Sequence, residues 1–148
     1  MKIYLATDHA GFELKEHLKG FLASLGHEVE DCGAHEYNPE DDYPDFVKKA
    51  AEAIQKDGFS SRVIVLGGSG QGEAIVANKV QGVRAAVYYG GNIDIVRLCR
   101  EHNDANILSI GARFISVVEV EEAVKLWLDT AFSGKDRHVR RISKVDSL

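Results

Sequence analysis

The glycine-rich loop at residues 67–72 has the residue types and spacing best suited to chemistry in this chain. Residues 63–66 are a short β-branched apolar run, which predicts a buried strand, and a helical pattern begins at about Gln71. Glycines let backbone N–H groups approach a ligand closely. The first N–H groups of a helix are unpaired and lie at the positive end of its dipole. The loop therefore predicts contact with an anion, either a phosphate or a developing oxyanion.

The glycine spacing excludes two common phosphate loops, because no Gly-Lys-Ser/Thr follows and residues 68–72 read Gly-x-Gly-x-Gly. A tight strand-to-helix turn is the alternative interpretation. Glu73 adds a carboxylate that would repel a phosphate held in the same loop. Two interpretations of Glu73 stay open on spacing alone: an acid that suits the first turn of a helix, or a general base beside an oxyanion site.

Polar candidates elsewhere also have two interpretations each. Asp8-His9 precedes a helix and is either a cap with a solvated histidine or a pair that faces a pocket, where His9 could donate to a phosphate or a sugar hydroxyl. His102-Asn103 suits a helix C-terminus, and Tyr43 suits an exposed position. Arg137 and Arg141 are four residues apart, so on a helix they share a face. They form either a solvated basic tail or a phosphate clamp.

Metal binding and covalent catalysis find little support in the sequence. The six histidines lack ligand spacing, and no His-Glu-x-x-His motif or Cys/His cluster occurs. Ser69 has no general base at a recognisable spacing, and Cys99 falls among the apolar positions of a helix. We expect no metal.

The bulk properties favour one domain spanning residues 1–148. The chain is 45% apolar and 28% charged, and its formal net charge of -5 argues against general nucleic-acid binding. Two cysteines that form no Cys-x-x-Cys pair predict a reducing, cytoplasmic setting. No apolar run is long enough to cross a bilayer, so we expect no membrane contact.

Strand and helix patterns alternate five times, which predicts a parallel sheet with helices on both faces. Ligands bind such sheets beyond the carboxyl ends of the strands. Asp8-His9, the glycine loop and Gly111–Arg113 all fall at such ends. The expected strands are 2–7, 27–32, 63–66, 83–88 and 106–110, and the expected helices are 11–25, a helix from about Pro44, one from about Gln71, one from Gly90-Gly91 to 101–103, and 117–132.

Apolar spacing predicts which side chains each helix buries. The expected buried positions are Leu14, Leu18, Phe21, Leu22 and Leu25 in the first helix; Phe46, Ala50, Ala53 and Ile54 in the second; Ile95, Leu98 and Cys99 in the fourth; and Val120, Val124, Trp127, Leu128 and Ala131 in the last.

Five motifs in the same order resemble the ribose-5-phosphate isomerase B family, which also includes galactose-6-phosphate isomerase subunits. The motifs span essentially the whole chain: residues 6–11, residues 67–73 with 77–79, residues 102–106, residues 111–113 and residues 137–141. The resemblance implies a Rossmann-like three-layer α/β/α sandwich with a five-stranded parallel sheet. It also implies a homo-oligomer, either a dimer or a tetramer, with active sites at the subunit interface. The activity that it implies is aldose–ketose isomerisation of a sugar phosphate without a metal or a cofactor.

The resemblance also implies a role for each site residue. Asp8 and His102 would handle ring opening and proton traffic at the sugar oxygens, and His9, Arg137 and Arg141 would hold the phosphate. The enediolate would be stabilised, and the sugar oxygens contacted, by the loop residues Gly68, Ser69, Gly70, Gln71 and Gly72. The pocket would be lined by Tyr43, Asn103 and Arg113, some of them from the partner subunit.

The chain departs from many family members at position 67, where they have a cysteine base and this chain has glycine. It resembles the branch in which a glutamate early in the helix replaces that cysteine, and Glu73 matches it. The expected reaction joins D-ribose 5-phosphate and D-ribulose 5-phosphate through a cis-enediol. Two alternatives stay open: the same chemistry on a six-carbon sugar phosphate, and a non-catalytic anion- or nucleotide-binding module.

Overall fold

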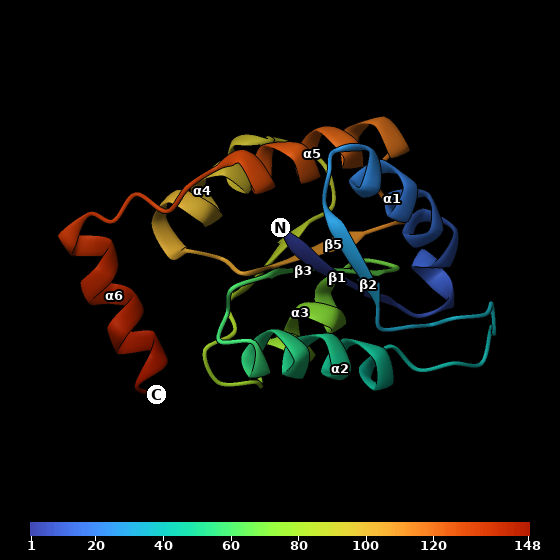
Figure 1. The fold of residues 1–148 in the computed structure, drawn as a ribbon, viewed down its shortest axis with the longest axis horizontal. Coiled ribbons are helices and arrows are strands. Elements are labelled where there is room, and N and C mark those ends of the chain that lie inside the picture. The colour runs from blue at the N-terminus through green and yellow to red at the C-terminus, as the bar shows by residue number, and fades with distance from the viewer.

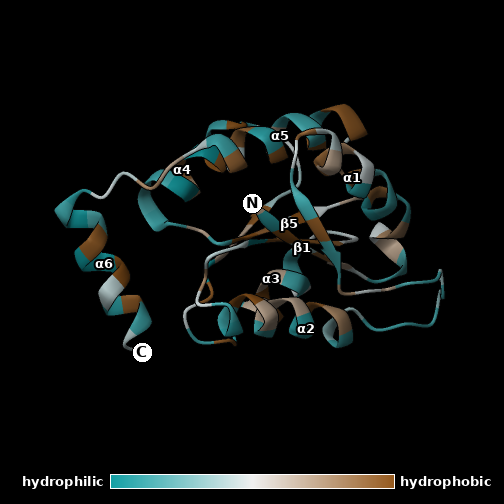
Figure 2. Ribbon diagram, viewed as in Figure 1, coloured by the Kyte–Doolittle hydropathy of each residue, from teal (hydrophilic) through white to brown (hydrophobic).

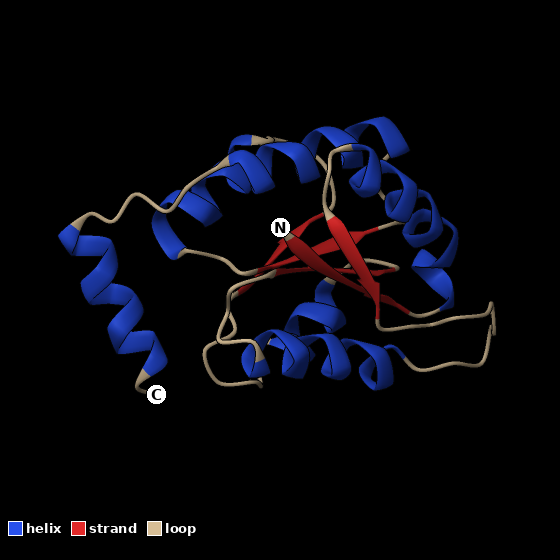
Figure 3. Ribbon diagram, in the orientation of Figure 1, coloured by secondary structure: helices blue, strands red, loops and turns tan.

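The computed structural model describes residues 1–148, and its centre is a five-stranded parallel sheet (Figure 1, Figure 3). The order across the sheet is β2-β1-β3-β5-β4, and every neighbouring pair is parallel. The predicted α/β class and the five parallel strands are confirmed. The strands are β1 (Lys2–Thr7), β2 (Glu28–Asp31), β3 (Arg62–Gly67), β4 (Ala85–Tyr88) and β5 (Ile107–Gly111).

Helices cover both faces of the sheet, as the alternating pattern predicts (Figure 1). The helices are the single-turn η1 (His9–Gly11), α1 (Phe12–Ser24), α2 (Tyr43–Lys56), α3 (Gln71–Ala77), α4 (Asp94–Asn103), α5 (Val117–Asp129) and α6 (Asp136–Asp146). One core lies between the sheet and α1, α4 and α5, and the other lies between the sheet and α2 and α3. Figure 2 shows hydrophobic residues along the central strands and a hydrophilic connection between β2 and α2.

The last helix, α6, stands at one end of the molecule beyond the end of α4 (Figure 1). It extends the basic tail seen in the sequence into a regular helix, and His138 is its buried residue. None of the helices is both long and apolar enough to cross a membrane.

Two predicted helices differ in their ends and faces. The fourth begins at Asp94 because Gly90 and Gly91 both have positive φ values, which a right-handed helix does not accept. Its Ile95 is exposed, so that part of the prediction is wrong, and Val96 faces the core instead. The last predicted helix ends at Asp129, where the Thr130 hydroxyl donates to the Leu126 carbonyl, and Ala131 is exposed beyond it.

The first two helices also bury a different set of side chains from the predicted one. In α1, Leu25 lies past the end and is 39% exposed, whereas Lys15 is fully buried because Asp31 and the Ala34 carbonyl satisfy its ammonium group. In α2, Val47 and Ala51 are fully buried with the predicted Ala50 and Ile54. The predicted Phe46 and Ala53 are only partly buried.

The strand order reverses between β1 and β3, which are neighbours in the sheet. After β1 the chain continues to β2 on one side, and after β3 it continues to β4 and β5 on the other. The crevice beyond the carboxyl ends of such a pair is where α/β folds place their ligands. Asp8 follows β1 and the glycine loop follows β3, so the fold sets both at this point.

Candidate functional site

The glycine loop is held in a fixed shape between the end of β3 and the end of β5. The carbonyls of Gly67 and Gly68 accept from the backbone N–H groups of Ala112 (2.8 Å) and Arg113 (3.2 Å). Gly70 has a φ of 77°, and a β-carbon there would lie 3.0 Å from the backbone of Ile110, so only glycine fits without strain. The loop is therefore a rigid cradle of backbone rather than a loose turn.

The carboxylate of Glu73 is buried directly against this loop. The residue is 4% exposed, which is unusual for an ionisable side chain. A β-carbon built on Gly67 would lie 2.5 Å from Oε2 of Glu73 and closer still to Oε1. The carboxylate therefore fills the space that a side chain at position 67 would take. This geometry supports the resemblance, in which a glutamate replaces a base at that position.

Burial raises the pKa of the Glu73 carboxyl, and the nearby charge of Asp8 raises it further, against the lowering effect of a backbone hydrogen bond. A carboxylate with a raised pKa is a stronger base than an exposed one. Glu73 thus combines basicity with a place beside backbone donors, which a merely dipole-matched acid on the surface would not have.

Asp8 and His9 lie in the same crevice and are held by separate contacts. Asp8 is 6% exposed, and its Oδ1 accepts from the Ala10 N–H at 2.9 Å. His9 is held by Asp41, whose Oδ1 lies 2.7 Å from the ring Nδ1 and also accepts from the His9 backbone N–H at 2.9 Å. Asp8, His9 and Asp41 each offer a possible metal-ligand atom within 4.8 Å of the others. In this structure the Nδ1 of His9 and the Oδ1 of Asp41 contact each other.

Three more predicted residues lie around the glycine loop. The Tyr43 hydroxyl lies against Gly72, where an added β-carbon would be 2.5 Å away. Arg113 reaches over Gly68, with Nη1 at 3.3 Å from the position of an added β-carbon. Ser69 Oγ accepts weakly from the Gln71 N–H at 3.4 Å. One chain therefore brings together Asp8, His9, Tyr43, Gly68, Ser69, Gly70, Gln71, Gly72, Glu73 and Arg113, which we call the loop half.

The remaining predicted residues form a second group, the tail half, which consists of His102, Asn103, Arg137 and Arg141. His102 and Asn103 end α4, which runs back from the carboxyl end of β4 to the amino end of β5. Arg137 and Arg141 are on α6, at the same end (Figure 1). The tail half therefore lies at the opposite end of the sheet from the loop half, and one chain does not unite the two.

His138, which the sequence analysis did not single out, organises the tail half. It is 2% exposed, and its ring lies against the ring of His102 with centroids 4.4 Å apart and the two planes tilted by 42°. Its Nε2 accepts from Arg137 Nε at 3.2 Å, which leaves Nδ1 to donate to Ser133 Oγ at 2.8 Å. Burial lowers the pKa of His138, and the neighbouring His102 and Arg137 lower it further. A neutral histidine thus orients one predicted phosphate ligand and supports another predicted catalytic group.

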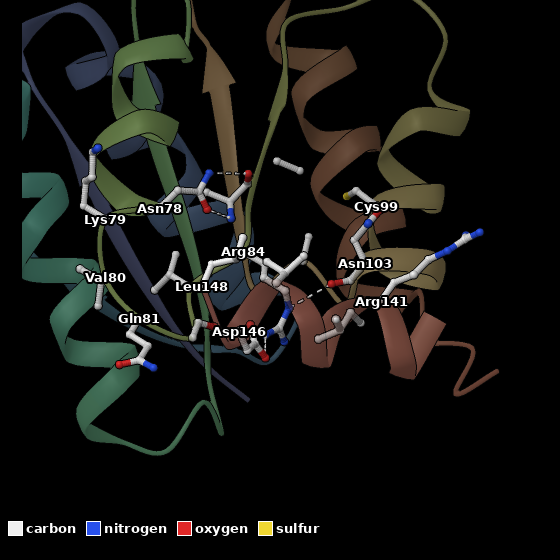
Figure 4. A pocket seen from close by; sticks show the side chains of 17 residues that line it. Asn78, Lys79, Val80, Gln81, Arg84, Cys99, Asn103, Arg141, Asp146 and Leu148 are labelled. Carbon is white, nitrogen blue, oxygen red and sulfur yellow. Dashed lines mark hydrogen bonds and ion pairs between the residues drawn. The ribbon is translucent and has the colours of Figure 1, made fainter. Parts of the chain in front are cut away.

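A groove of about 770 Å³ runs between α6 and the amino end of β4 (Figure 4). Asn103 and Arg141 line it, and no residue of the loop half does. Arg84 fixes its shape, because its guanidinium donates to the Asn103 carbonyl and pairs with Asp104 and Asp146. The groove is therefore a partly charged surface that takes two residues of the tail half, Asn103 and Arg141.

Asp41, Arg84 and His138 are the polar residues that sequence reasoning missed. Nothing in the sequence of residues 33–43 marks Asp41 as different from its acidic neighbours. His138 lies between the two predicted arginines, and this adjacency was the one available signal.

The chain is similar to known proteins over nearly its whole length. Residues 3–145 match the family model described as Ribose/Galactose Isomerase. The ribose-5-phosphate isomerase B of Mycolicibacterium paratuberculosis is 45% identical over 142 residues, which is 96% of this chain and 87% of that protein.

Solved structures agree. The Clostridium thermocellum ribose-5-phosphate isomerase B has a TM-score of 0.92 at 45% identity and covers 99% of this chain and 96% of its own. The Mycoplasma genitalium ribose-5-phosphate isomerase B, solved with bound ribulose-5-phosphate, has a TM-score of 0.93 at 34% identity and covers 99% and 94%. On the extent of these matches and the confirmed fold, this chain belongs to the ribose/galactose isomerase family.

Proposed function

We propose that the protein is an aldose–ketose isomerase that interconverts D-ribose 5-phosphate and D-ribulose 5-phosphate without a metal or a cofactor. The observation that carries the proposal is the buried Glu73 carboxylate beside the rigid glycine loop. The names of the relatives and the bound ribulose-5-phosphate in the Mycoplasma genitalium structure support this choice of substrate.

In the proposed reaction, Asp8 and His102 open the sugar ring by moving protons at its oxygens. Glu73 then removes the proton from C2 of the aldose, which gives a cis-enediol, and returns it to C1 to form the ketose. The hydroxyl proton moves from O2 to O1, so the sum is an isomerisation with no atom gained or lost. The N–H groups of the loop stabilise the enediolate oxygen, and Ser69 contacts the sugar oxygens.

The phosphate binds away from this loop, at His9, Arg137 and Arg141. This separation removes the repulsion between a phosphate and Glu73 that the sequence posed. Tyr43, Asn103 and Arg113 line the pocket between the two anion positions.

We also propose that each active site joins the loop half of one subunit to the tail half of a second copy. The observation that supports this is that, within one chain, the two halves lie at opposite ends of the sheet. The groove beside α6 presents Asn103 and Arg141 of the tail half at this end. We place the enzyme in the cytoplasm, where the free thiols of Cys32 and Cys99 stay reduced.

Isomerisation of D-ribose 5-phosphate, measured as ketose formation with and without a chelator, tests the reaction. Chelator-resistant activity is expected in the wild type, with a loss of about 10²–10⁴-fold in Glu73→Gln. A panel of six-carbon sugar phosphates runs beside it, since the family includes galactose isomerases by name. Turnover of those six-carbon sugars alone would change the proposed substrate to a six-carbon sugar phosphate. No turnover of any sugar phosphate would refute the function.

Subunit complementation tests the shared site. Glu73→Gln and Arg141→Ala are each expected to be nearly inactive. In a mixed dimer one of the two sites receives both wild-type halves, so random reassortment should restore about a quarter of the wild-type activity. If mixing restores nothing although the subunits exchange, the site is not shared.

A further inference from the structure

We propose that Asp41 is a positioning residue that fixes the imidazole of His9 for phosphate binding. The inference rests on the proposed function, because His9 is the group through which Asp41 would act. It assigns a role to the connection between β2 and α2, which the mechanism so far leaves without one.

The contacts of Asp41 are directed at a single neighbour. Its Oδ1 accepts from both the backbone N–H and the ring Nδ1 of His9, at 2.9 and 2.7 Å. Its side chain is only 8% exposed, and Oδ2 is buried without a hydrogen-bond partner in the chain. A buried carboxylate with an unpartnered oxygen destabilises the fold unless another interaction compensates. The two bonds to His9 are the only compensation that the structure provides.

A backbone turn at residues 38–41 sets the direction of the Asp41 carboxylate. The side-chain oxygen of Asn38 accepts from the Glu40 N–H at 3.0 Å, and the backbone carbonyl of Asn38 accepts from the Asp41 N–H at 3.1 Å. This turn carries Asp41 back toward the end of β1. Tyr37, from the same connection, meets the His9 ring edge-on with centroids 6.4 Å apart. The connection thus holds the ring by one hydrogen bond and one aromatic contact.

The chemistry follows from which nitrogen Asp41 occupies. An ionised carboxylate can only accept, so the Nδ1 that it contacts carries a hydrogen. Nε2 is then the nitrogen left for the substrate. A hydrogen on Nε2 can be donated to a phosphate oxygen, and the Asp41 carboxylate on the other side of the ring strengthens that bond. Asp8 Oδ2, 3.9 Å from Nδ1, is the other charged group that faces the ring.

Steady-state kinetics on the full-length enzyme test the inference. Asp41→Asn keeps the shape and one oxygen acceptor but removes the charge, and should raise KM for D-ribose 5-phosphate about tenfold while kcat changes less than about threefold. Asp41→Ala should raise KM further. The matched control is Asp42→Asn, since Asp42 is adjacent, exposed and without a side-chain capping bond.

A double variant separates positioning from a general structural role. If Asp41 acts through His9, then Asp41→Asn combined with His9→Gln should be no worse than His9→Gln alone, within about twofold. Additive losses, or a fall in kcat with KM unchanged, would overturn the proposal.

Nitrogen-15 spectra of histidine-labelled enzyme with inorganic phosphate give a readout that does not need turnover. The His9 Nδ1 signal, assigned with His9→Gln, should be that of a protonated nitrogen in the wild type and should shift in Asp41→Asn but not in Asp42→Asn. An unchanged signal in Asp41→Asn would also overturn it. A wild type without isomerase activity would refute the proposed function, while these spectra would still decide whether Asp41 fixes the ring.

Discussion

Replacing Gly67 by alanine tests whether the place of the Glu73 carboxylate matters for catalysis. The new β-carbon would lie 2.5 Å from Oε2, and ordinary contact begins near 3.4 Å, so Oε2 must retreat by about 1 Å and Oε1 by more. Because the clashing atoms are the far end of a side chain, we expect a modest loss of stability, within about 1–3 kcal/mol. A 1 Å displacement of a catalytic group can cost about 10²-fold in rate. We therefore expect kcat to fall about 10²-fold.

The assay is ketose formation from D-ribose 5-phosphate, with thermal unfolding measured on the same samples. Gly20→Ala is the matched control: Gly20 is in α1 with nothing within 4 Å of an added β-carbon, so stability should rise by about 0.5–1 kcal/mol with activity unchanged. Gly67→Ala with Glu73→Ala removes the clash and should regain stability without activity. Full kcat in Gly67→Ala would refute the claim that Glu73 acts from its observed position.

Three further predictions rest on single residues. Because burial raises the pKa of Glu73 above its ordinary 4.5, its ionisation opposes folding as pH rises; Glu73→Gln should therefore gain more in Tm at about pH 8 than at about pH 4, and an equal gain at both would contradict this. Because burial lowers the pKa of His138 below its ordinary 6.5, the stability of the wild type should fall as the pH drops below that value. Thermal melts of His138→Asn should therefore depend less on pH. The same variant should have a raised KM, because Arg137 loses its hydrogen-bond partner. Ser116→Ala removes the capping box of α5 and should cost about 1 kcal/mol in urea unfolding with normal activity; an unchanged free energy of unfolding would contradict this.

Local patterns were enough for the order and type of the main elements. The apolar run at residues 63–66 lies within β3, and the glycines after it form the rigid loop, because both depend on short-range sterics. Helix faces were less predictable. Ile95 and Leu25 are apolar and fit the expected stripes, but which side of a helix is buried depends on the neighbours it packs against. Lys15 is buried because Asp31 is brought to it by the fold, which no local pattern reveals.

The site residues also divide into those that local sequence motifs indicate and those that the fold brings together. Residue types and family motifs were enough to nominate Glu73, His9 and the two arginines. The fold was needed to set the Glu73 carboxylate in the space beside Gly67 and to join Asp41 to His9 across 32 positions of sequence. It also placed the tail half at the far end of the sheet from the loop half. These are contacts between segments remote in sequence, and they are fixed by the strand order and by packing rather than by local preference.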